Sequence, residues 1–254
     1  MATDLTAIAL SLLLVVVAIG ISFRRKLHLE KELVVAATRA MVQLFILAAL
    51  IRAVFASLGL TSLLLIVMLA AATFTSARRL VGVPGSTWVS GVSIAASSGF
   101  ALIVLFALGI FEPEPRVIIP VAGILIGNTM TATSLAGARM RDELTRNLAD
   151  IESRLALGVR LKIALAPYVR TATVNSLIPT IDATKNVGLV TLPGAFVGMM
   201  LGGASPVLAA QVQLIVLFML LGAVSLAAMI ATILVVRRYR TEGERIVVSE
   251  SLPL

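Results

Sequence analysis

Long apolar runs constrain the fold of this chain more than any other feature. Several of them approach the roughly 20 apolar residues that cross the hydrocarbon core of a bilayer. Hydrophobic residues make up 59% of the 254 residues and aromatic residues only 5%, so aliphatic side chains supply most of this surface. The apolar/polar alternation of a membrane β-barrel is absent. The sequence therefore predicts an all-α, polytopic transmembrane helical bundle in the inner or plasma membrane of the cell.

We expect about seven spans in one bundle. They are residues 5–23, 33–55, 60–74, 87–111, 116–135, one span within 171–201, and 211–236. The first apolar run lacks a basic leading region and a cleavage site, so it is expected to be a retained span and not a signal peptide.

The distribution of Lys and Arg predicts the orientation of these spans. Most basic residues lie in four segments, which are 24–32, 78–79, 137–170 and 237–245. The alternate connections contain a single basic residue, Arg116. Because cytoplasmic loops carry the excess of Lys and Arg, we expect the N-terminus outside and the C-terminus in the cytoplasm.

The chain is expected to form a single transmembrane domain over residues 1–254. Its largest piece outside the membrane is the cytoplasmic segment 137–170. We predict a helix over residues 142–157, an interruption at Gly158, and a second helical piece that leads into the sixth span. A short cytoplasmic helix of this kind is suited to docking on another protein or lying on anionic lipid.

The sixth span is too long for one straight helix. Its 31 residues would extend about 46 Å as an α-helix, against a hydrocarbon core of roughly 30 Å. Pro179, Gly188, Pro193 and Gly194 lie within it. We therefore predict a kinked or broken helix, with a short re-entrant piece after Pro193.

Charge and cysteine content exclude several kinds of site. The net charge of +8 would suggest nucleic-acid binding in a soluble protein, but here the basic clusters separate apolar runs, so we expect no nucleic-acid partner. The absence of cysteine excludes disulfides, iron–sulfur clusters and thiolate metal sites. We predict no cofactor and no dedicated metal site.

Ionisable and amide side chains occur where only apolar residues are expected. Asp182 and Lys185 are three residues apart, so they share a helix face near mid-membrane. Asn186 follows them, and Asn128 and Gln43 lie deep in the fifth and second spans. The first pair is either a structural ion pair or part of a polar path for a substrate. Asn128 either joins helices by hydrogen bonds or lines the same cavity as Asp182.

The stretch GNTMTATS, residues 127–134, also carries four hydroxyl groups. Ser and Thr in a helix can donate to their own carbonyl four residues back. We therefore expect these hydroxyls to be satisfied within the bundle.

Several motifs resemble those of known transport proteins. ESRLALG at 152–158 resembles the EAA-type loop of ABC transporter permeases, with Ser153 and Arg154 in place of two alanines. Longer stretches look like the FetB-type permease family, which includes bacterial iron-export permeases and plant aluminium-tolerance proteins. They are ATRAMVQL at 37–44, IIPVAGILIGNTM at 118–130, LIPTIDATKNVGLVTLPGAFVGMMLGGASP at 177–206, and QVQLIVLFML at 211–220.

The resemblance implies a half-transporter that exports iron or another metal or polar solute. By the same resemblance, two copies of the chain would pair with two copies of a separate ATPase subunit. The chain itself has no Walker A pattern, so it is not expected to hydrolyse ATP or to be an enzyme. The coupling helix would comprise Glu152, Leu155, Ala156 and Gly158. The substrate path would involve Gln43, Asn128, Asp182, Lys185 and Asn186.

Two other functions remain open from the sequence alone. The chain could be a gradient-driven secondary transporter or channel that uses Asp182 as its coupling carboxylate. It could also be a membrane scaffold with no transport activity. Transport in liposomes without an ATPase would favour the first, and indifference to neutralising Asp182 and Lys185 would favour the second.

Overall fold

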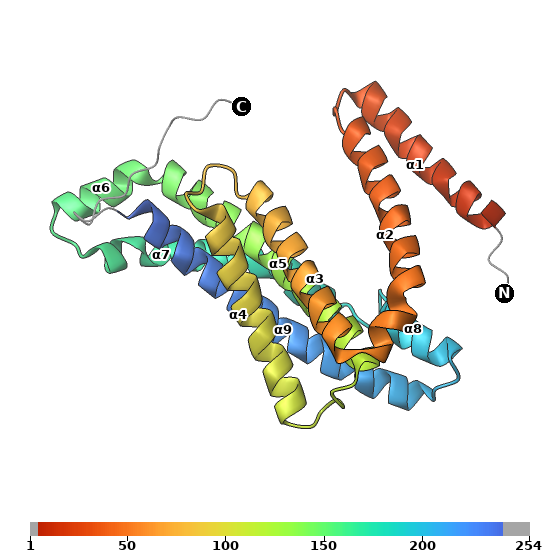
Figure 1. Ribbon diagram of the computed structural model, residues 1–254. Helices are drawn as coiled ribbons and strands as arrows, with labels where there is room; N and C mark the ends of the chain where they lie inside the picture. Colours follow the sequence, from red (N-terminus) through yellow and green to blue (C-terminus); the bar gives the residue numbers. More distant parts are fainter. Residues whose placement is uncertain (1–4, 241–254) are drawn as a thin grey trace. The chain divides into compact units, whose positions relative to one another are not determined.

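The computed structural model describes residues 5–240, and this part of the chain is helical, with no strand (Figure 1). The helices are α1 (Leu5–Arg25), α2 (Glu30–Ala56), α3 (Leu58–Arg79), α4 (Ser86–Ala107), α5 (Pro115–Arg146), α6 (Leu148–Ala156), α7 (Leu161–Lys185), α8 (Gly194–Leu201) and α9 (Pro206–Tyr239). The predicted all-α class is confirmed.

The contacts divide the chain into two compact units, Met1–Leu60 and Thr61–Leu254, which are described separately. In the first unit, α1 packs against α2 as a hairpin. Ser22 closes the connection, because its hydroxyl donates to Glu30 Oε1 at 2.8 Å and accepts from Leu29 N at 3.1 Å. The expectation of one domain over the whole chain stays a prediction.

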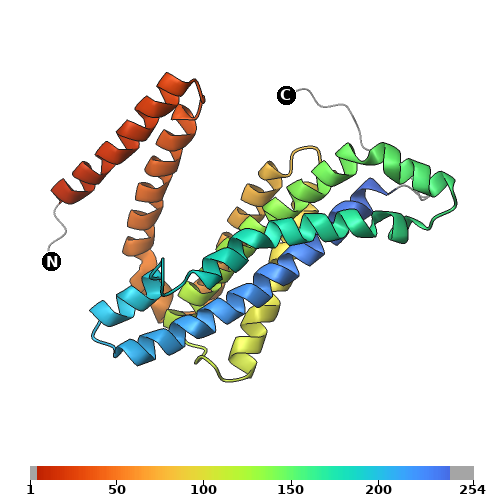
Figure 2. The same cartoon turned by 180° about the vertical axis from the view of Figure 1, so that it is seen from behind.

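The second unit is built around α9. This helix packs against α4, α5 and α7, while α5 also contacts α4 and α7. Figure 2 shows α9 running alongside α7 on the face of the unit opposite to that in Figure 1. The short helices lie at the periphery, with α8 packed on α9 and α6 on α7.

Five helices in the described part of the chain are long and apolar enough to cross a membrane: α2, α3, α4, α5 and α9. Helix α7, which contains most of the first half of the predicted sixth span, is not among them. It contains four charged residues and two prolines. The side chains of residues 5–9, in the first predicted span, lie outside the described part, as do both ends of the chain, 1–4 and 241–254. The count of seven spans and the orientation of the termini stay predictions.

The helix expected over residues 142–157 is interrupted, and this part of the prediction is wrong. Helix α5 continues past the expected end of its span to Arg146, and α6 starts at Leu148. Asn147 separates them, and its side-chain amide donates to the carbonyl of Glu143 at 2.9 Å. The predicted interruption at Gly158 is confirmed, since this residue has a φ of +81°, which glycine adopts without a steric penalty.

The long sixth segment is broken, as predicted, but not at its first proline. Helix α7 continues through Pro167 and Pro179 and ends at Lys185. A turn follows in which the carbonyl of Asn186 accepts from Val190 N at 2.9 Å and Thr191 N at 3.2 Å. Helix α8 begins directly after Pro193. Whether α8 re-enters the membrane stays a prediction.

Hydrogen bonds between hydroxyl groups, and a close contact at one glycine, hold α3 against α4 and α5. Ser76 Oγ on α3 accepts from Ser90 Oγ of α4 and forms a second hydrogen bond with Ser134 Oγ of α5, each at 3.0 Å. Near the end of α3, Leu80 fits against Gly137 so closely that a Cβ there would lie 2.6 Å from the Leu80 side chain. The absence of a side chain at Gly137 is therefore what allows this close approach.

Candidate functional site

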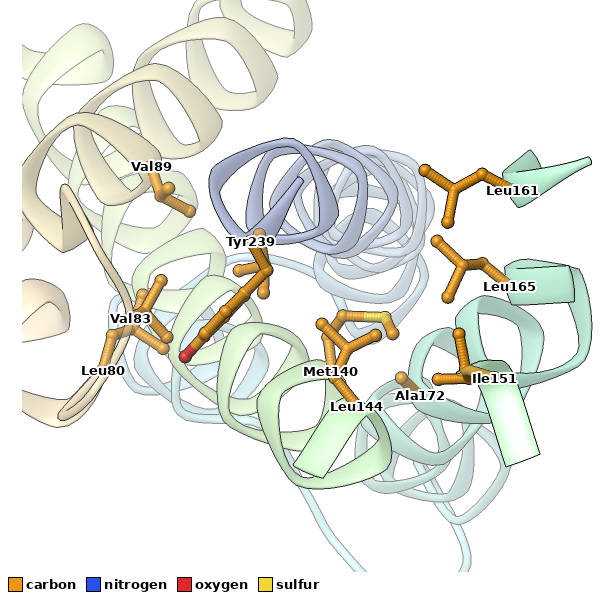
Figure 3. Close-up of a cluster of buried hydrophobic side chains, with 11 residues drawn as sticks. Leu80, Val83, Val89, Met140, Leu144, Ile151, Leu161, Leu165, Ala172 and Tyr239 are labelled. Carbon is orange, nitrogen blue, oxygen red and sulfur yellow. The ribbon is translucent and has the colours of Figure 1, made fainter. Parts of the chain in front are cut away.

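A buried apolar cluster joins six parts of the second unit at one end. We call it the basic-end core, because the basic segments around 78–79, 137–170 and 237–240 meet there (Figure 3). Its side chains come from the α3–α4 connection, α4, α5, α6, α7 and α9. They are Leu80, Val83, Val89, Met140, Leu144, Ile151, Leu161, Leu165, Ala172, Val235 and Tyr239.

Two hydrogen bonds tie the α3–α4 connection to this core. Arg141 Nη1 donates to the carbonyl of Val81 at 2.5 Å, and the Tyr239 hydroxyl donates to the carbonyl of Gly82 at 2.5 Å. Three basic segments therefore lie on the same side of the second unit, as the predicted topology requires.

Helix α6 presents one face to the basic-end core and the other to solvent. Ile151 is fully buried and Leu148 and Leu155 pack against the core. The opposite face exposes Glu152 and Ala156, together with Leu157 just beyond the end of the helix. The Leu157 side chain is 84% exposed. Of the predicted coupling residues, Leu155 thus faces its own bundle, while Glu152, Ala156 and Gly158 face outward.

Polar contacts fix α6 on the start of α7. The Tyr168 hydroxyl on α7 donates to Asp150 Oδ2, which also accepts from Arg154 Nε at 2.9 Å. The hydrogen bond from Tyr168 is the main cause that holds the pKa of Asp150 below its ordinary value, and it raises the pKa of Tyr168. These three residues were not recognised in the sequence, although Asp150 and Arg154 have the spacing of a helix-stabilising pair.

Several polar side chains are exposed on α5 and α7, two helices that pack against each other. Asn128 and Thr131 are exposed on α5, and Asn175, Asp182 and Lys185 are exposed on α7, which packs against α5. We call these five residues the polar stripe. The Asn128 side-chain amide donates to the carbonyl of Ile124 at 2.8 Å, a bond within its own helix. The sequence allowed Asn128 either to join helices by hydrogen bonds or to line a cavity. Its side-chain amide donates within its own helix, so the structure does not show the first alternative for this amide.

Asp182 and Lys185 form the expected contact on one face of α7. Lys185 Nζ lies 3.6 Å from Asp182 Oδ1, and both side chains are more than half exposed. Asn186 is also exposed and ends the helix. Asn128 is exposed on α5, and Asp182, Lys185 and Asn186 are exposed at the end of α7, so their membership of one substrate path stays a prediction. Gln43 is exposed on α2 in the first unit, so its place in the predicted path stays a prediction.

The hydroxyls of residues 127–134 follow the expectation with one exception. Thr129, Thr131 and Ser134 donate to the carbonyl four residues back at 2.8 Å, 3.2 Å and 2.9 Å. Thr133 Oγ1 is buried without a partner, as is Ser93 Oγ on α4. The sequence shows which residues have hydroxyls but not which rotamer each adopts in a packed interior.

Comparison with known proteins places this chain in a family. The model of the uncharacterised protein family UPF0014 matches residues 5–240. The chain belongs to this family. It is a multi-pass membrane protein, as the apolar helices indicate.

Three similar proteins are matched over most of their length. Protein ALUMINUM SENSITIVE 3 of Arabidopsis thaliana is 36% identical over 89% of this chain and 84% of its own length. UPF0014 membrane protein STAR2 of Oryza sativa subsp. japonica is 37% identical over 87% of this chain and 78% of its own. "Probable iron export permease protein FetB" of Escherichia coli (strain K12) is 35% identical over 96% of this chain and 95% of its own. No solved structure matches the chain.

Proposed function

We propose that this chain is the membrane-spanning permease subunit of an ABC-type transporter that exports a metal ion or another polar solute. A separate ATPase subunit would dock on α6 and supply the energy. The name of the E. coli relative, an iron export permease protein, supports a transport role. The observation that carries the proposal is the two-faced helix α6, fixed on one side and open on the other.

A force applied to α6 would be transmitted to the bundle through the basic-end core. Burying a side chain such as Ile151 stabilises the contact by roughly 2 kcal/mol, and the Tyr168–Asp150 hydrogen bond adds to this attachment. The same core includes residues of α5, α7 and α9. Displacement of α6 by a docked partner would therefore move three helices of the second unit together.

The polar stripe supports a path between two copies of the chain. Charged and amide side chains are costly in contact with lipid, so they usually face a protein interior or a water-filled cavity. In one chain the polar stripe is on the surface. Two chains with their stripes facing each other would enclose these groups, and a polar solute could cross between them.

The docking of an ATPase is tested by changing the exposed face of α6. We expect Leu157→Asp to weaken co-purification of an ATP-hydrolysing subunit with the full-length chain at least about ten-fold, because it replaces an apolar contact with a charge. Val81→Asp is the matched control, since Val81 is also exposed at the basic end but lies outside α6. Equal retention of the subunit by both variants would contradict the proposal.

The chain contains no cysteine, so pairing of two copies can be tested with single cysteines. We expect Asn175→Cys on the polar stripe to be cross-linked between copies by a short bis-maleimide in membranes. Leu63→Cys, exposed on α3, should not be. Cross-linking of Leu63→Cys but not of Asn175→Cys would show that the polar stripe does not lie between two chains.

A gradient-driven transporter is distinguished by reconstitution. The purified chain in liposomes, without an ATPase, should not accumulate a solute against its gradient. If it does, and if Asp182→Asn abolishes this activity, Asp182 is a coupling carboxylate and the ABC proposal is wrong.

A further inference from the structure

A cavity of about 330 Å³ lies between α9 and the segment that follows α7. The turn before α8 contributes Val187 and Leu192, and α8 contributes Phe196. Helix α9 contributes Leu214, Leu217 and Gln213. The walls are therefore apolar except for one amide. This size is within the range of cavities that bind small molecules in proteins.

Gln213 is the unusual member of this wall. Only 6% of this residue is exposed, and its Oε1 atom is itself buried and has no hydrogen-bond partner. A buried acceptor without a partner costs about 1–3 kcal/mol. Three rotatable bonds separate the amide from the backbone, so the amide can turn toward a molecule in the cavity. The free energy lost at this atom is recovered if the occupant donates a hydrogen bond.

We infer that this cavity binds a small amphipathic molecule with an apolar body and one hydroxyl or N–H donor, which Gln213 accepts. The volume of about 330 Å³ equals that of about eleven water molecules at roughly 30 Å³ each, so a small organic molecule can occupy it. This inference does not depend on an ATPase partner or on the polar stripe.

Other occupants fit the same walls less well. A lipid alkyl chain would fill the apolar space but leave Gln213 Oε1 unsatisfied. Water would satisfy the oxygen, but apolar cavities tend to stay dry, since a bound water needs two to four polar partners. A molecule with an apolar body and one hydrogen-bond donor fills the apolar space and also satisfies Gln213 Oε1.

Occupancy would stabilise the position of α8. This helix has eight residues, none of them buried, and it packs on α9. A ligand that touches Phe196 on one side and Leu214 and Leu217 on the other would add contacts between the two helices. Amide hydrogen exchange in residues 187–201 should therefore slow when the ligand binds.

The test uses 4-butylphenol and its methyl ether, which differ in the donor that the cavity is inferred to recognise. The full-length chain in nanodiscs is exposed to each compound at equal concentration in the membrane, and exchange is measured by mass spectrometry. With the phenol at five times its Kd, exchange in residues 187–201 should slow about six-fold. With the ether it should slow less than two-fold.

Two variants provide the control. Gln213→Leu should abolish the difference between phenol and ether, because it removes the acceptor and keeps an apolar wall. Gln211→Leu, two residues earlier and exposed, should behave like the unchanged chain. Equal protection by both compounds in the unchanged chain, protection by neither, or a difference that persists in Gln213→Leu would each overturn the inference. Because the first comparison needs no variant, a Gln213→Leu chain that fails to fold does not prevent a decision.

Discussion

The buried hydroxyl groups of the second unit differ in what they contribute to it. Ser76 is hydrogen-bonded to side chains of two other helices, whereas Ser93 and Thr133 are buried without a partner. A hydrogen bond between membrane helices contributes about 0.6 kcal/mol on average, while a buried group without a partner is destabilising. The side chain type therefore does not predict the effect of removing a hydroxyl.

We expect Ser76→Ala to lower the free energy of unfolding by about 1 kcal/mol, because Ser90 loses its partner. Thr133→Val keeps the shape of the side chain and removes an unsatisfied hydroxyl, so it should be neutral or stabilising. Reversible unfolding in mixed micelles measures both. Destabilisation by Thr133→Val comparable to that of Ser76→Ala would indicate that Thr133 has a partner after all.

A second prediction at this scale concerns the pH dependence of α6. Asp150 has a pKa below its ordinary value of 3.8, so its contribution is fully present above about 3.8 and is lost as pH falls through the lower folded value. Tyr168 has a pKa above its ordinary 10.0, so its contribution is present below 10.0 and is lost at higher pH. The attachment of α6 should be strongest between these limits.

Amide exchange in residues 148–156, corrected for the intrinsic rate at each pH, measures this attachment. It should be constant from pH 5 to 8.5 and become severalfold faster near pH 3. Asp150→Asn should exchange faster at neutral pH and lose most of the acid dependence. The same acid dependence in this variant would mean that another group titrates.

At the scale of elements, glycine positions decide how closely helices approach. A Cβ at Gly137 would clash with Leu80, which is almost fully buried, whereas a Cβ at Gly127 on the same helix meets nothing within 4 Å. Gly137→Ala should therefore cost about 1–3 kcal/mol of stability. Gly127→Ala should gain up to about 1 kcal/mol from helix propensity.

A double-mutant cycle checks the cause of the first effect. In a chain that already carries Leu80→Ala, the cost of Gly137→Ala should disappear, because the clashing side chain is gone. A cost that remains in this background would assign the effect to another contact of α5.

Much of the element order could be predicted from the sequence, but helix ends could not. Apolar runs locate membrane segments, and Gly158 and the region around Gly188 were recognised as interruptions. The end of α5 was placed too early, because loss of hydropathy marks a membrane surface and not the end of a helix. At the break, Asn147 forms a side-chain bond to the carbonyl of Glu143, and hydropathy does not reveal a local contact of this kind.

Only part of the candidate site could be predicted, because spacing along a helix can be read from the sequence and contacts with other elements cannot. The pairing of Asp182 with Lys185 follows from their spacing on a helix. The inward orientation of Leu155 could have been read from its spacing to Ile151 and Leu148, which places all three on one face. Gln213 carried a signal too, as an amide within a long apolar run, but the absence of a partner for it depends on how α8 packs.

At the scale of the whole molecule, orientation in the membrane is the main prediction. Leu157→Cys should be shielded from a membrane-impermeant maleimide in right-side-out vesicles, because residues 137–170 are expected in the cytoplasm. Glu112→Cys, in the exposed α4–α5 connection, should react. Labelling of Leu157→Cys but not of Glu112→Cys would show that the topology is the opposite of the predicted one. Helix α6 would then be out of reach of a cytoplasmic ATPase.

The continuity of α7 has a mechanical consequence. Its 25 residues extend about 36 Å, from Leu161 in the basic-end core to Lys185 at the far end. Pro167 removes one backbone hydrogen bond near the start and is a natural hinge. A tilt of about 5° there, on a lever arm of some 27 Å, would carry the Asp182–Lys185 pair sideways by about 2 Å. A small rotation at the start of α7 would thus be amplified into a larger sideways movement at its other end.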